Sequence, residues 1–242
     1  MPTTPEAAIL CGGFGTRLAG LQFGLPKPML PVGGQPLLAG LVAALARQGV
    51  ARIVLCTGQG REPIRAFFAA RDCGAEVLFS EETEPLGTAG ALRLALPLLR
   101  TDPLLALNGD SWAPFDLSAL VARQTETSAD IALVAARADD RGDAGSLLLD
   151  ERGRVRAFAE KRTVPSARLH SAGIYLMRRR VIEAIPAGRA VSLEREILPL
   201  YLDGRMAALT VSGPVVDIGT PERLAEAQAA AAQGRGPFPR EG

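Results

Sequence analysis

The sequence has few of the residues that bind zinc or form disulfides. It contains one histidine, His170, and three cysteines, and no two of the cysteines have the Cys-x-x-Cys spacing. A structural zinc site needs a full set of such ligands and a disulfide framework needs an even set, so the sequence argues against both. An odd number of cysteines without motif spacing is typical of reduced thiols, which indicates a cytoplasmic protein.

Two further absences narrow the class of protein. The net charge is only +1, so no general affinity for nucleic acid or for an anionic membrane is expected. No apolar run approaches the roughly 18 residues of a membrane span, and no charged leader precedes an apolar segment. Hydrophobic residues make up 48% of the 242 residues, which is enough for one substantial core. We therefore expect a soluble protein with neither a nucleic-acid nor a membrane partner.

Lysine is also scarce, and the two lysines stand out. Lys27 and Lys161 are the only lysines among 27 basic residues. Lys27 lies in the stretch 10–32, LCGGFGTRLAGLQFGLPKPMLPV, where a glycine-rich loop and Arg17 follow an apolar run. Glycines let backbone N–H groups approach phosphate oxygens, and the two cations supply charge. The stretch therefore predicts a phosphate-binding loop.

Two common phosphate motifs do not fit this loop. A dinucleotide fingerprint needs a third glycine, but residues 16–18 are Thr-Arg-Leu, and it needs an acidic residue after the second strand, where residues 56–58 are Cys-Thr-Gly. A P-loop needs Gly-Lys followed by Ser or Thr, which is absent. An ordinary turn would leave the neighbouring Arg17 and Lys27 unexplained.

The apolar pattern predicts an α/β fold. Short apolar strands alternate with helices in the first 110 residues, which is typical of a mainly parallel sheet with helices on its faces. We expect strands at 7–11, 51–57, 75–79 and 104–107 and helices at 35–48, 62–70 and 87–100. Beyond them we expect helices at 116–124, 178–185, 192–202 and 221–232 and strands at 131–136, 145–150, 154–159, 169–177, 206–211 and 215–218. Residues 1–233 are predicted to form one domain, followed by a flexible tail at 234–242.

Five stretches together resemble the sugar-1-phosphate nucleotidyltransferases. The first is G-G-x-G-T-R-L followed by P-K-P-M-x-P-V, a highly specific signature. The others are residues 84–92 (EPLGTAGAL), 108–110 (NGD), 160–161 (EK) and 216–221 (VDIGTP). The resemblance covers roughly residues 7–230, and its pattern is nearest to mannose-1-phosphate and D-glycero-D-manno-heptose-1-phosphate guanylyltransferases.

The resemblance implies a fold, a metal and a set of site residues. The fold is a Rossmann-like open, mainly parallel mixed sheet flanked by helices, of the nucleotide-diphospho-sugar transferase type, with a small sugar-binding lobe. Residues 7–110 would mainly bind nucleotide and residues 111–233 mainly sugar phosphate. Mg²⁺ is the expected cofactor, with Asp110 and Asp217 as its ligands. The other expected site residues are Arg17 and Lys27 for catalysis; Leu10, Gly12, Gly13, Gly15, Thr16, Glu82, Pro85, Gly87 and Thr88 for the nucleotide; and Asn108, Gly145, Glu160, Lys161 and Gly173 for the sugar phosphate.

The chemistry of nucleotidyl transfer suits these residue types. A sugar-1-phosphate oxygen attacks the α-phosphorus of a nucleoside triphosphate and pyrophosphate leaves, so catalysis is mostly charge neutralisation and alignment. Arg17 is expected at the β/γ-phosphates, Lys27 between the α-phosphate and the attacking phosphate, and Lys161 at the sugar phosphate. Asp110 and Asp217 end apolar strands, although taken alone each could equally be a turn aspartate.

The substrates are less sharply indicated. Glu82 stands where uridylyl- and thymidylyltransferases tend to carry glutamine, and a carboxylate that only accepts hydrogen bonds suits the two adjacent donors of guanine. Glu81 or Glu84 could take this part, or the acidic run could simply be a solvated loop. The segment 192–199 resembles manno-configured enzymes, and the spacer 19–25 favours the heptose type.

Other interpretations stay open at this point. GTP and a manno-configured sugar 1-phosphate are the expected partners, and the sequence allows a homodimer. A uridylyl- or thymidylyltransferase acting on glucose 1-phosphate, and a non-catalytic nucleotide-sugar-binding regulator on the same fold, are the alternatives. Trp112 could floor the sugar pocket or pack in the core, whereas His170 and Cys11 are expected to be structural.

Overall fold

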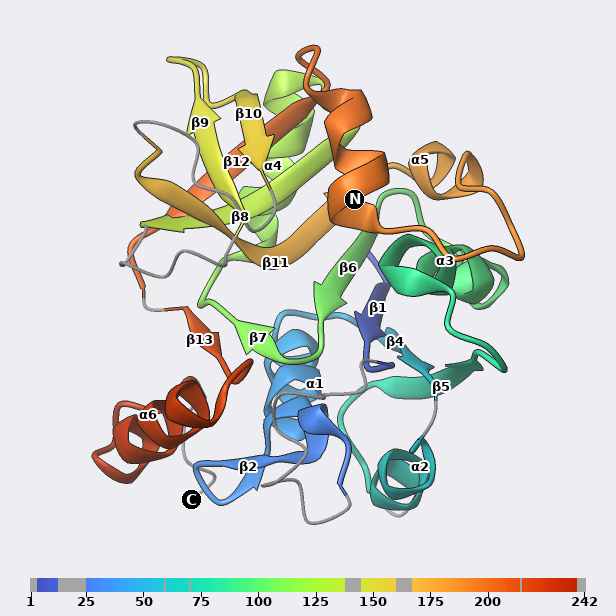
Figure 1. The fold of residues 1–242 in the computed structure, drawn as a ribbon, viewed down its shortest axis with the longest axis vertical. Coiled ribbons are helices and arrows are strands. Elements are labelled where there is room, and N and C mark those ends of the chain that lie inside the picture. The colour runs from blue at the N-terminus through green and yellow to red at the C-terminus, as the bar shows by residue number, and fades with distance from the viewer. Residues whose placement is uncertain are drawn as a thin grey trace.

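The computed structural model describes residues 4–12, 25–58, 60–69, 71–137, 145–159, 167–213 and 215–238. Within these ranges a nine-stranded sheet runs through the molecule, in the order β10-β9-β11-β6-β1-β4-β5, with β8 beside β11 and β12 beside β8 (Figure 1). The strands are β1 (Ala7–Leu10), β4 (Arg52–Thr57), β5 (Glu76–Glu81), β6 (Leu104–Asn108), β8 (Ile131–Arg137), β9 (Ser146–Leu149), β10 (Val155–Ala159), β11 (Leu169–Met177) and β12 (Met206–Val211).

The first half of the chain forms the parallel part of the sheet. Strands β6, β1, β4 and β5 are mutually parallel, whereas β11 is antiparallel to β6, β8 and β9. Buried side chains on both faces of β1, β4 and β6 explain the continuous apolar runs that mark these three strands in the sequence. The expected mainly parallel, mixed sheet flanked by helices is confirmed, and the carboxyl ends of β1, β4 and β6 meet at one edge.

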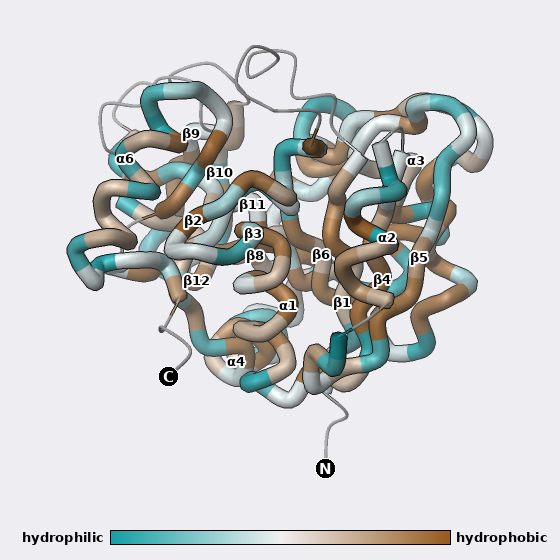
Figure 2. The backbone as a smooth tube through the Cα atoms, turned by 90° about the horizontal axis from the view of Figure 1, so that it is seen from below, coloured by the Kyte–Doolittle hydropathy of each residue, from teal (hydrophilic) through white to brown (hydrophobic). Residues whose placement is uncertain are grey.

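Helices cover both faces of the sheet. Ile9 and Leu55 point to the face that is covered by α1 (Leu37–Arg47), α2 (Glu62–Ala69) and α4 (Leu117–Thr127). Ala8 and Cys56, one residue along each strand, point to the face that is covered by α3 (Gly87–Ala95) and α5 (Arg179–Glu183). Figure 2 shows the result, with apolar strands at the centre and polar segments outside. No helix of the described residues is both long enough and apolar enough to cross a membrane.

Two expected helices are shorter than predicted, because prolines interrupt them. The helix expected over 87–100 ends as α3 at Ala95 and continues as a 3-10 turn, Leu96–Leu98, around Pro97. The helix expected over 192–202 is a π-helical segment, Leu193–Ile197, followed by a 3-10 turn, Leu198–Tyr201, that contains Pro199. Proline lacks the N–H that a continuing α-helix needs. The expected cap is confirmed, since the Ser192 side chain accepts a hydrogen bond from the Arg195 N–H.

Two small two-stranded sheets complete the fold, and of their four strands only the one expected at 215–218 was predicted, which the structure shortens to β13. One joins β2 (Pro31–Val32) to β3 (Gln35–Pro36), and the other joins β7 (Ser111–Trp112) to β13 (Val216–Asp217). Strands of two residues are too short to show any periodicity. The pairing of β7 with β13 nevertheless matters for function, because it places the neighbours of Asp110 beside Asp217.

The end of the described chain packs back against the domain. The last helix, α6 (Pro221–Ala232), is followed by a segment that turns back and inserts Phe238 beside Trp112, with ring centroids 5.7 Å apart. A Cβ on Gly40 of α1 would lie 2.1 Å from the Phe238 ring, so the ring fills the space that this glycine leaves. Phe238, which lies within the tail predicted at 234–242, thus packs against the body of the domain, and the flexibility of the tail stays a prediction. Trp112 is 4% exposed and packs in the core, as the second of its two interpretations had it.

Candidate active site

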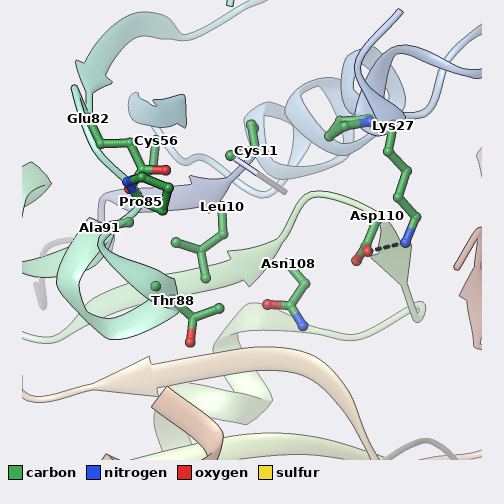
Figure 3. A pocket seen from close by; sticks show the side chains of 13 residues that line it. Leu10, Cys11, Lys27, Cys56, Glu82, Pro85, Thr88, Ala91, Asn108 and Asp110 are labelled. Carbon is green, nitrogen blue, oxygen red and sulfur yellow. Dashed lines mark hydrogen bonds and ion pairs between the residues drawn. The ribbon is translucent and has the colours of Figure 1, made fainter. Parts of the chain in front are cut away.

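A pocket of about 290 Å³ opens at the carboxyl ends of β1, β4 and β6 (Figure 3). Figure 3 shows Glu82 and Pro85 at one end of the pocket and Lys27 and Asp110 at the other, with Leu10 and Asn108 between them. The pocket is lined by Leu10, Cys11, Gly12, Lys27, Pro28, Cys56, Glu82, Pro85, Gly87, Thr88, Ala91, Asn108 and Asp110.

Strand register brings the floor of the pocket together. Leu10 pairs with Cys56 on one side and with Asn108 on the other, so three strands end at the same level. Gly109 then crosses close to β1, because its N–H donates to the Leu10 carbonyl oxygen over 2.9 Å. A Cβ on Gly109 would lie 2.7 Å from that oxygen, so the Asn-Gly-Asp triplet needs glycine at its centre.

Glu82 is held tightly at the first end of the pocket. Its Oε1 atom lies against Gly12 and Gly58, where added Cβ atoms would come within 2.7 and 2.8 Å of it. Its Oε2 atom accepts a hydrogen bond from the Leu86 N–H over 3.1 Å. Burial raises the pKa of this carboxyl group, and the Leu86 N–H only partly offsets the rise. The carboxylate is thus fixed in orientation, with acceptor positions left over.

The N-terminus of α3 forms the wall next to Glu82. Gly87 has a φ of +68°, and its missing side chain lets the Val191 carbonyl oxygen approach to 2.6 Å from where a Cβ would be. The hydroxyl group of Thr88 donates to Glu194 Oε2 over 2.9 Å. The expected nucleotide-binding residues Pro85, Gly87 and Thr88 therefore do line the pocket.

Lys27 and Asp110 form an ion pair at the other end of the pocket. Lys27 begins a 3-10 turn, Lys27–Met29, and its Nζ atom lies 2.5 Å from Asp110 Oδ2. The Lys27 side chain is only 13% exposed, so its charge is largely withdrawn from water. Partial desolvation strengthens such a pair relative to one on an open surface.

Asp217, near the far end of the chain, lies close enough to this ion pair for both of its members to affect the Asp217 pKa. Asp217 pairs with Ser111 across the β7–β13 sheet, and the Ile218 N–H donates to the Asp110 carbonyl oxygen over 3.0 Å. Burial raises the pKa of Asp217, and the nearby Asp110 carboxylate raises it further. The Asp217 side chain accepts hydrogen bonds from the Gly219 N–H and from the Arg223 guanidinium. Gly219, Lys27 and Arg223 each lower the pKa of Asp217 and so offset part of the rise.

This pair of carboxylates fits Mg²⁺ by its donor chemistry. The Asp110 carboxylate raises the pKa of Asp217, which marks a concentration of negative charge that a divalent cation relieves. Mg²⁺ prefers oxygen ligands and is commonly held by one or two carboxylates together with phosphates and water. Within the described residues no cluster of three or more His, Cys, Asp or Glu side chains offers a fuller protein cage. Asp110 and Asp217 are therefore the residues here that could hold the ion.

A bulge in β11 forms the border toward the second half of the chain. The pairing of β11 with β8 is irregular between Ser171 and Tyr175, and Gly173 sits in this stretch with a φ of +71°. A Cβ on Gly173 would lie 2.7 Å from Asn108 Nδ2 and 3.0 Å from Ser111 Oγ. Asn108 thus reaches the β11 backbone, where a polar ligand can meet both.

The expected site residues fall into two groups. The described ones lie at the pocket or along its border, with Gly145 accepting a hydrogen bond from the Ser171 N–H near the bulge. Six others lie outside the described residues, and their roles stay predictions: Gly13, Gly15, Thr16, Arg17, Glu160 and Lys161.

Sequence reasoning missed several residues of the pocket. Cys11 and Cys56 are buried and line it, and burial raises the pKa of the Cys56 thiol to about 12. Their positions at the ends of two adjacent parallel strands would have pointed to the pocket. Glu194 was noted only as part of a sugar-related segment, and no sequence signal ties it to Thr88.

Comparison with known proteins agrees with this geometry. The family model described as nucleotidyl transferase matches residues 6–234. A mannose-1-phosphate guanylyltransferase of Mycobacterium tuberculosis is 35% identical over 97% of this chain and 66% of its own length. A D-glycero-alpha-D-manno-heptose 1-phosphate guanylyltransferase of Campylobacter jejuni is 31% identical over 90% of this chain and 96% of its own length.

A solved structure also has the same fold as this chain. HddC from Yersinia pseudotuberculosis superimposes with a TM-score of 0.82 at 29% identity, covering 93% of this chain and 98% of that one. A second structure of HddC, with a TM-score of 0.79, is a complex with GMP-PN. This chain thus spans nearly all of HddC and of the Campylobacter protein but about two thirds of the mycobacterial one. Sequence, fold and pocket agree, and the chain belongs to the nucleotidyl transferase family.

Proposed function

We propose that this chain transfers GMP from GTP to a manno-configured sugar 1-phosphate, giving a GDP-sugar and pyrophosphate. The observation that supports the proposal most directly is the pocket itself. One end of it carries a fixed carboxylate, Glu82, and the other carries a partly buried ammonium–carboxylate pair, Lys27 and Asp110. The first suits a base that donates hydrogen bonds, and the second suits the phosphates that follow the base.

Lys27 is proposed to stabilise the transferring phosphate. Its ammonium group lies at the pocket end where Asp110 and Asp217 converge, so it can move from the carboxylate to a phosphate oxygen that carries more negative charge. A compact ammonium on a flexible stem suits two phosphates that change their separation during the reaction. Because the attacking phosphate is already ionised near neutral pH, no side chain need remove a proton.

Asp110 and Asp217 are proposed to hold the metal. Mg²⁺ bound there would neutralise the phosphate charge that develops as pyrophosphate leaves. The hydrogen bonds from Gly219 and Arg223 hold the Asp217 carboxylate in place. The β7–β13 pairing fixes the spacing of the two carboxylates before substrates arrive.

Glu82 is proposed to read the base. Guanine presents N1–H and the 2-amino group side by side, and a carboxylate can accept from both. Since Leu86 and the two flanking glycines already fix Glu82, the carboxylate does not have to be ordered on binding, which favours selectivity. For the sugar we propose the manno configuration, because the relatives named above are guanylyltransferases of mannose and heptose 1-phosphates.

The test is pyrophosphate release with Mg²⁺ from each common nucleoside triphosphate, paired with mannose, glucose and glycero-manno-heptose 1-phosphates. We expect release with GTP and a manno-configured sugar, and the nucleotide sugar should be identified by mass. Release only with UTP or dTTP and glucose 1-phosphate would refute the assignment of base and sugar. Nucleotide binding without turnover on any pair would favour a regulator.

Matched variants separate the site from general stability. Asp217→Asn should abolish release while leaving the fold intact, because the amide no longer supplies a negative charge. Asp203→Asn is the control, since Asp203 is exposed and pairs with Arg205 away from the pocket. Equal activity in the two variants would remove Asp217 from the mechanism.

A further inference from the structure

The chain leaves α6 through a Schellman motif, which turns it back against the domain. Gly234 has a φ of +74°, and its N–H donates to the Ala231 carbonyl oxygen over 3.1 Å. The Arg235 N–H donates to the Ala230 carbonyl oxygen over 2.9 Å. Glycine adopts this left-handed backbone without the strain that a side chain brings. The motif therefore fixes the direction in which the residues that lead to Phe238 leave the helix.

Phe238 reaches both α1 and the β7–β13 sheet. Its ring centroid lies 5.7 Å from that of Trp112 in β7, and its ring fills the space beside Gly40 of α1. Phe238 also packs against the apolar cluster that contains Ile218, and Val216 of β13 packs against the same cluster. One side chain from the end of the described chain thus contacts β7 directly and borders the cluster on which β13 rests.

The β7–β13 sheet has an apolar face and a face that carries a carboxylate of the candidate metal site. Trp112 pairs with Val216, and Ser111 pairs with Asp217. Because successive side chains of a strand point to opposite faces, Trp112 and Val216 share one face while Ser111 and Asp217 share the other. Phe238 packs on the apolar face, so it supports the sheet from the side opposite the carboxylate.

So short a sheet needs support from its surroundings. Each of its strands has two residues, and an isolated pair of strands is marginally stable in water even at ordinary length. The Ile218 N–H donates to the Asp110 carbonyl oxygen over 3.0 Å, which ties β13 to the start of β7. The contact between the Phe238 and Trp112 rings adds apolar packing to this backbone link.

We propose that Phe238 is a positioning residue for the metal. By packing behind β7 and β13, it holds Asp110 and Asp217 at the spacing that binds a divalent cation. This inference rests on the proposed function, in which these two carboxylates hold Mg²⁺, and it adds a residue that sets how tightly they do so. Phe238 itself touches neither the metal nor the substrates.

The experiment is titration of the intact protein with Mn²⁺ in the absence of nucleotide. Phe238→Ala should raise the dissociation constant about three- to tenfold, which is the cost of ordering one more side chain when the metal binds. In turnover, the Mg²⁺ concentration at half-maximal rate should rise by the same factor, while kcat at saturating Mg²⁺ stays near the wild-type value. Gly40→Ala should act in the same way by displacing the ring, and the double variant should be no worse than Phe238→Ala.

Phe67→Ala is the matched control. Phe67 is also a partly buried phenylalanine that packs against the core, with its ring centroid 5.1 Å from that of Phe68. Its helix, α2, lies on the opposite side of the molecule from β13 and α6 (Figure 1). If Phe238 merely stabilised the fold, Phe238→Ala and Phe67→Ala would bind Mn²⁺ alike. If it positions the carboxylates, only Phe238→Ala weakens binding, and Phe238→Leu, which keeps an apolar side chain beside Trp112, restores most of the affinity.

Hydrogen exchange of the Ile218 amide gives a second readout that needs no metal. This N–H is bonded to Asp110 only while the two strands stay together, so Phe238→Ala should speed its exchange about tenfold and Phe67→Ala should not. If thermal unfolding shows that Phe238→Ala does not fold, Gly40→Ala carries both measurements.

Two results would overturn the inference: wild-type Mn²⁺ affinity in Phe238→Ala, or an equal loss of affinity in Phe67→Ala. A wild-type protein that binds no Mn²⁺ would instead overturn the metal site of the proposed function. Exchange of the Ile218 amide then decides alone whether Phe238 holds β7 to β13, and exchange that is unchanged in Phe238→Ala would overturn that part as well.

Discussion

Removal of the Lys27 ammonium should make the nucleotide-free protein bind a divalent metal more tightly. Lys27→Met keeps the length of the side chain and removes its charge. In the structure, Nζ lies 2.5 Å from Asp110 Oδ2, one of the oxygens proposed to hold the metal. The ammonium group and the metal therefore compete for one carboxylate.

The geometry sets the size of the effect. A Mg²⁺ ion about 2.1 Å from that oxygen would lie at most about 4.6 Å from an unmoved Nζ atom. Repulsion between charges of +2 and +1 at that distance is about 2 kcal/mol in water and about 7 kcal/mol at an effective dielectric constant near 20. Lys27 must therefore withdraw when metal binds, and the lost charge-assisted hydrogen bond costs about 1.5–3 kcal/mol. Because Asp110 is partly exposed, we take the lower end, which is about a tenfold gain in affinity for the variant.

The assay is titration with Mn²⁺ in the absence of nucleotide, followed by calorimetry or electron paramagnetic resonance. Turnover should fall by orders of magnitude in the same variant, so affinity and activity move in opposite directions. Arg156→Met is the control, because Arg156 pairs with Asp150 over 2.8 Å outside the site. Unchanged or weaker Mn²⁺ binding by Lys27→Met would refute the reasoning.

Three other predictions test the pocket and the fold. Because burial raises the pKa of Glu82, this carboxylate should take up a proton at a higher pH than an ordinary glutamate. As the pH is lowered through that pKa, GDP affinity should fall for the wild type but not for Glu82→Gln. Parallel pH profiles of the two proteins would contradict the assignment. Gly40→Ala should displace the Phe238 ring and lower the free energy of unfolding by about 1–3 kcal/mol, yet cost almost nothing in a Phe238→Ala background, as measured by denaturant unfolding. Iodoacetamide should label the partly exposed Cys73 well before Cys56, because alkylation needs a thiolate and burial raises the pKa of Cys56 to about 12; early labelling of Cys56 would mean that the pocket opens.

The sequence predicted the layout of the fold because its main elements carry periodic signals. The buried strands β1, β4 and β6 are continuous apolar runs, and helices separate them along the chain. Parallel strands end at one edge, so the amino-acid pattern alone places the loop after Leu10 beside the triplet at Asn108. Glu82, Lys27 and Asp110 accordingly meet in one pocket, as expected.

Contacts between elements that are distant in sequence could not be predicted from such signals. The contact of Val191 with α3 and the hydrogen bond from Thr88 to Glu194 join segments that are remote in sequence and have no period in common. The insertion of Phe238 depends on the absence of a Cβ atom at Gly40. From the sequence alone, this glycine is only a residue of low helix propensity inside a helix. Sequence patterns indicate which face of an element is apolar, whereas such contacts depend on how elements that are distant in sequence pack against each other.

The β7–β13 sheet also has a consequence for the order of events while the protein folds during its synthesis. During synthesis, Asp110 emerges from the ribosome long before Asp217, and the pairing of β7 with β13, together with the hydrogen bond from the Ile218 N–H to the Asp110 carbonyl oxygen, links the two residues. A nascent chain can thus assemble β1, β4 and β6 before Asp217, one of the two proposed metal ligands, has been synthesised. Nascent chains arrested before and after β13 should therefore differ sharply in Mn²⁺ binding. Mn²⁺ binding would then report when β13 has paired with β7, late in folding.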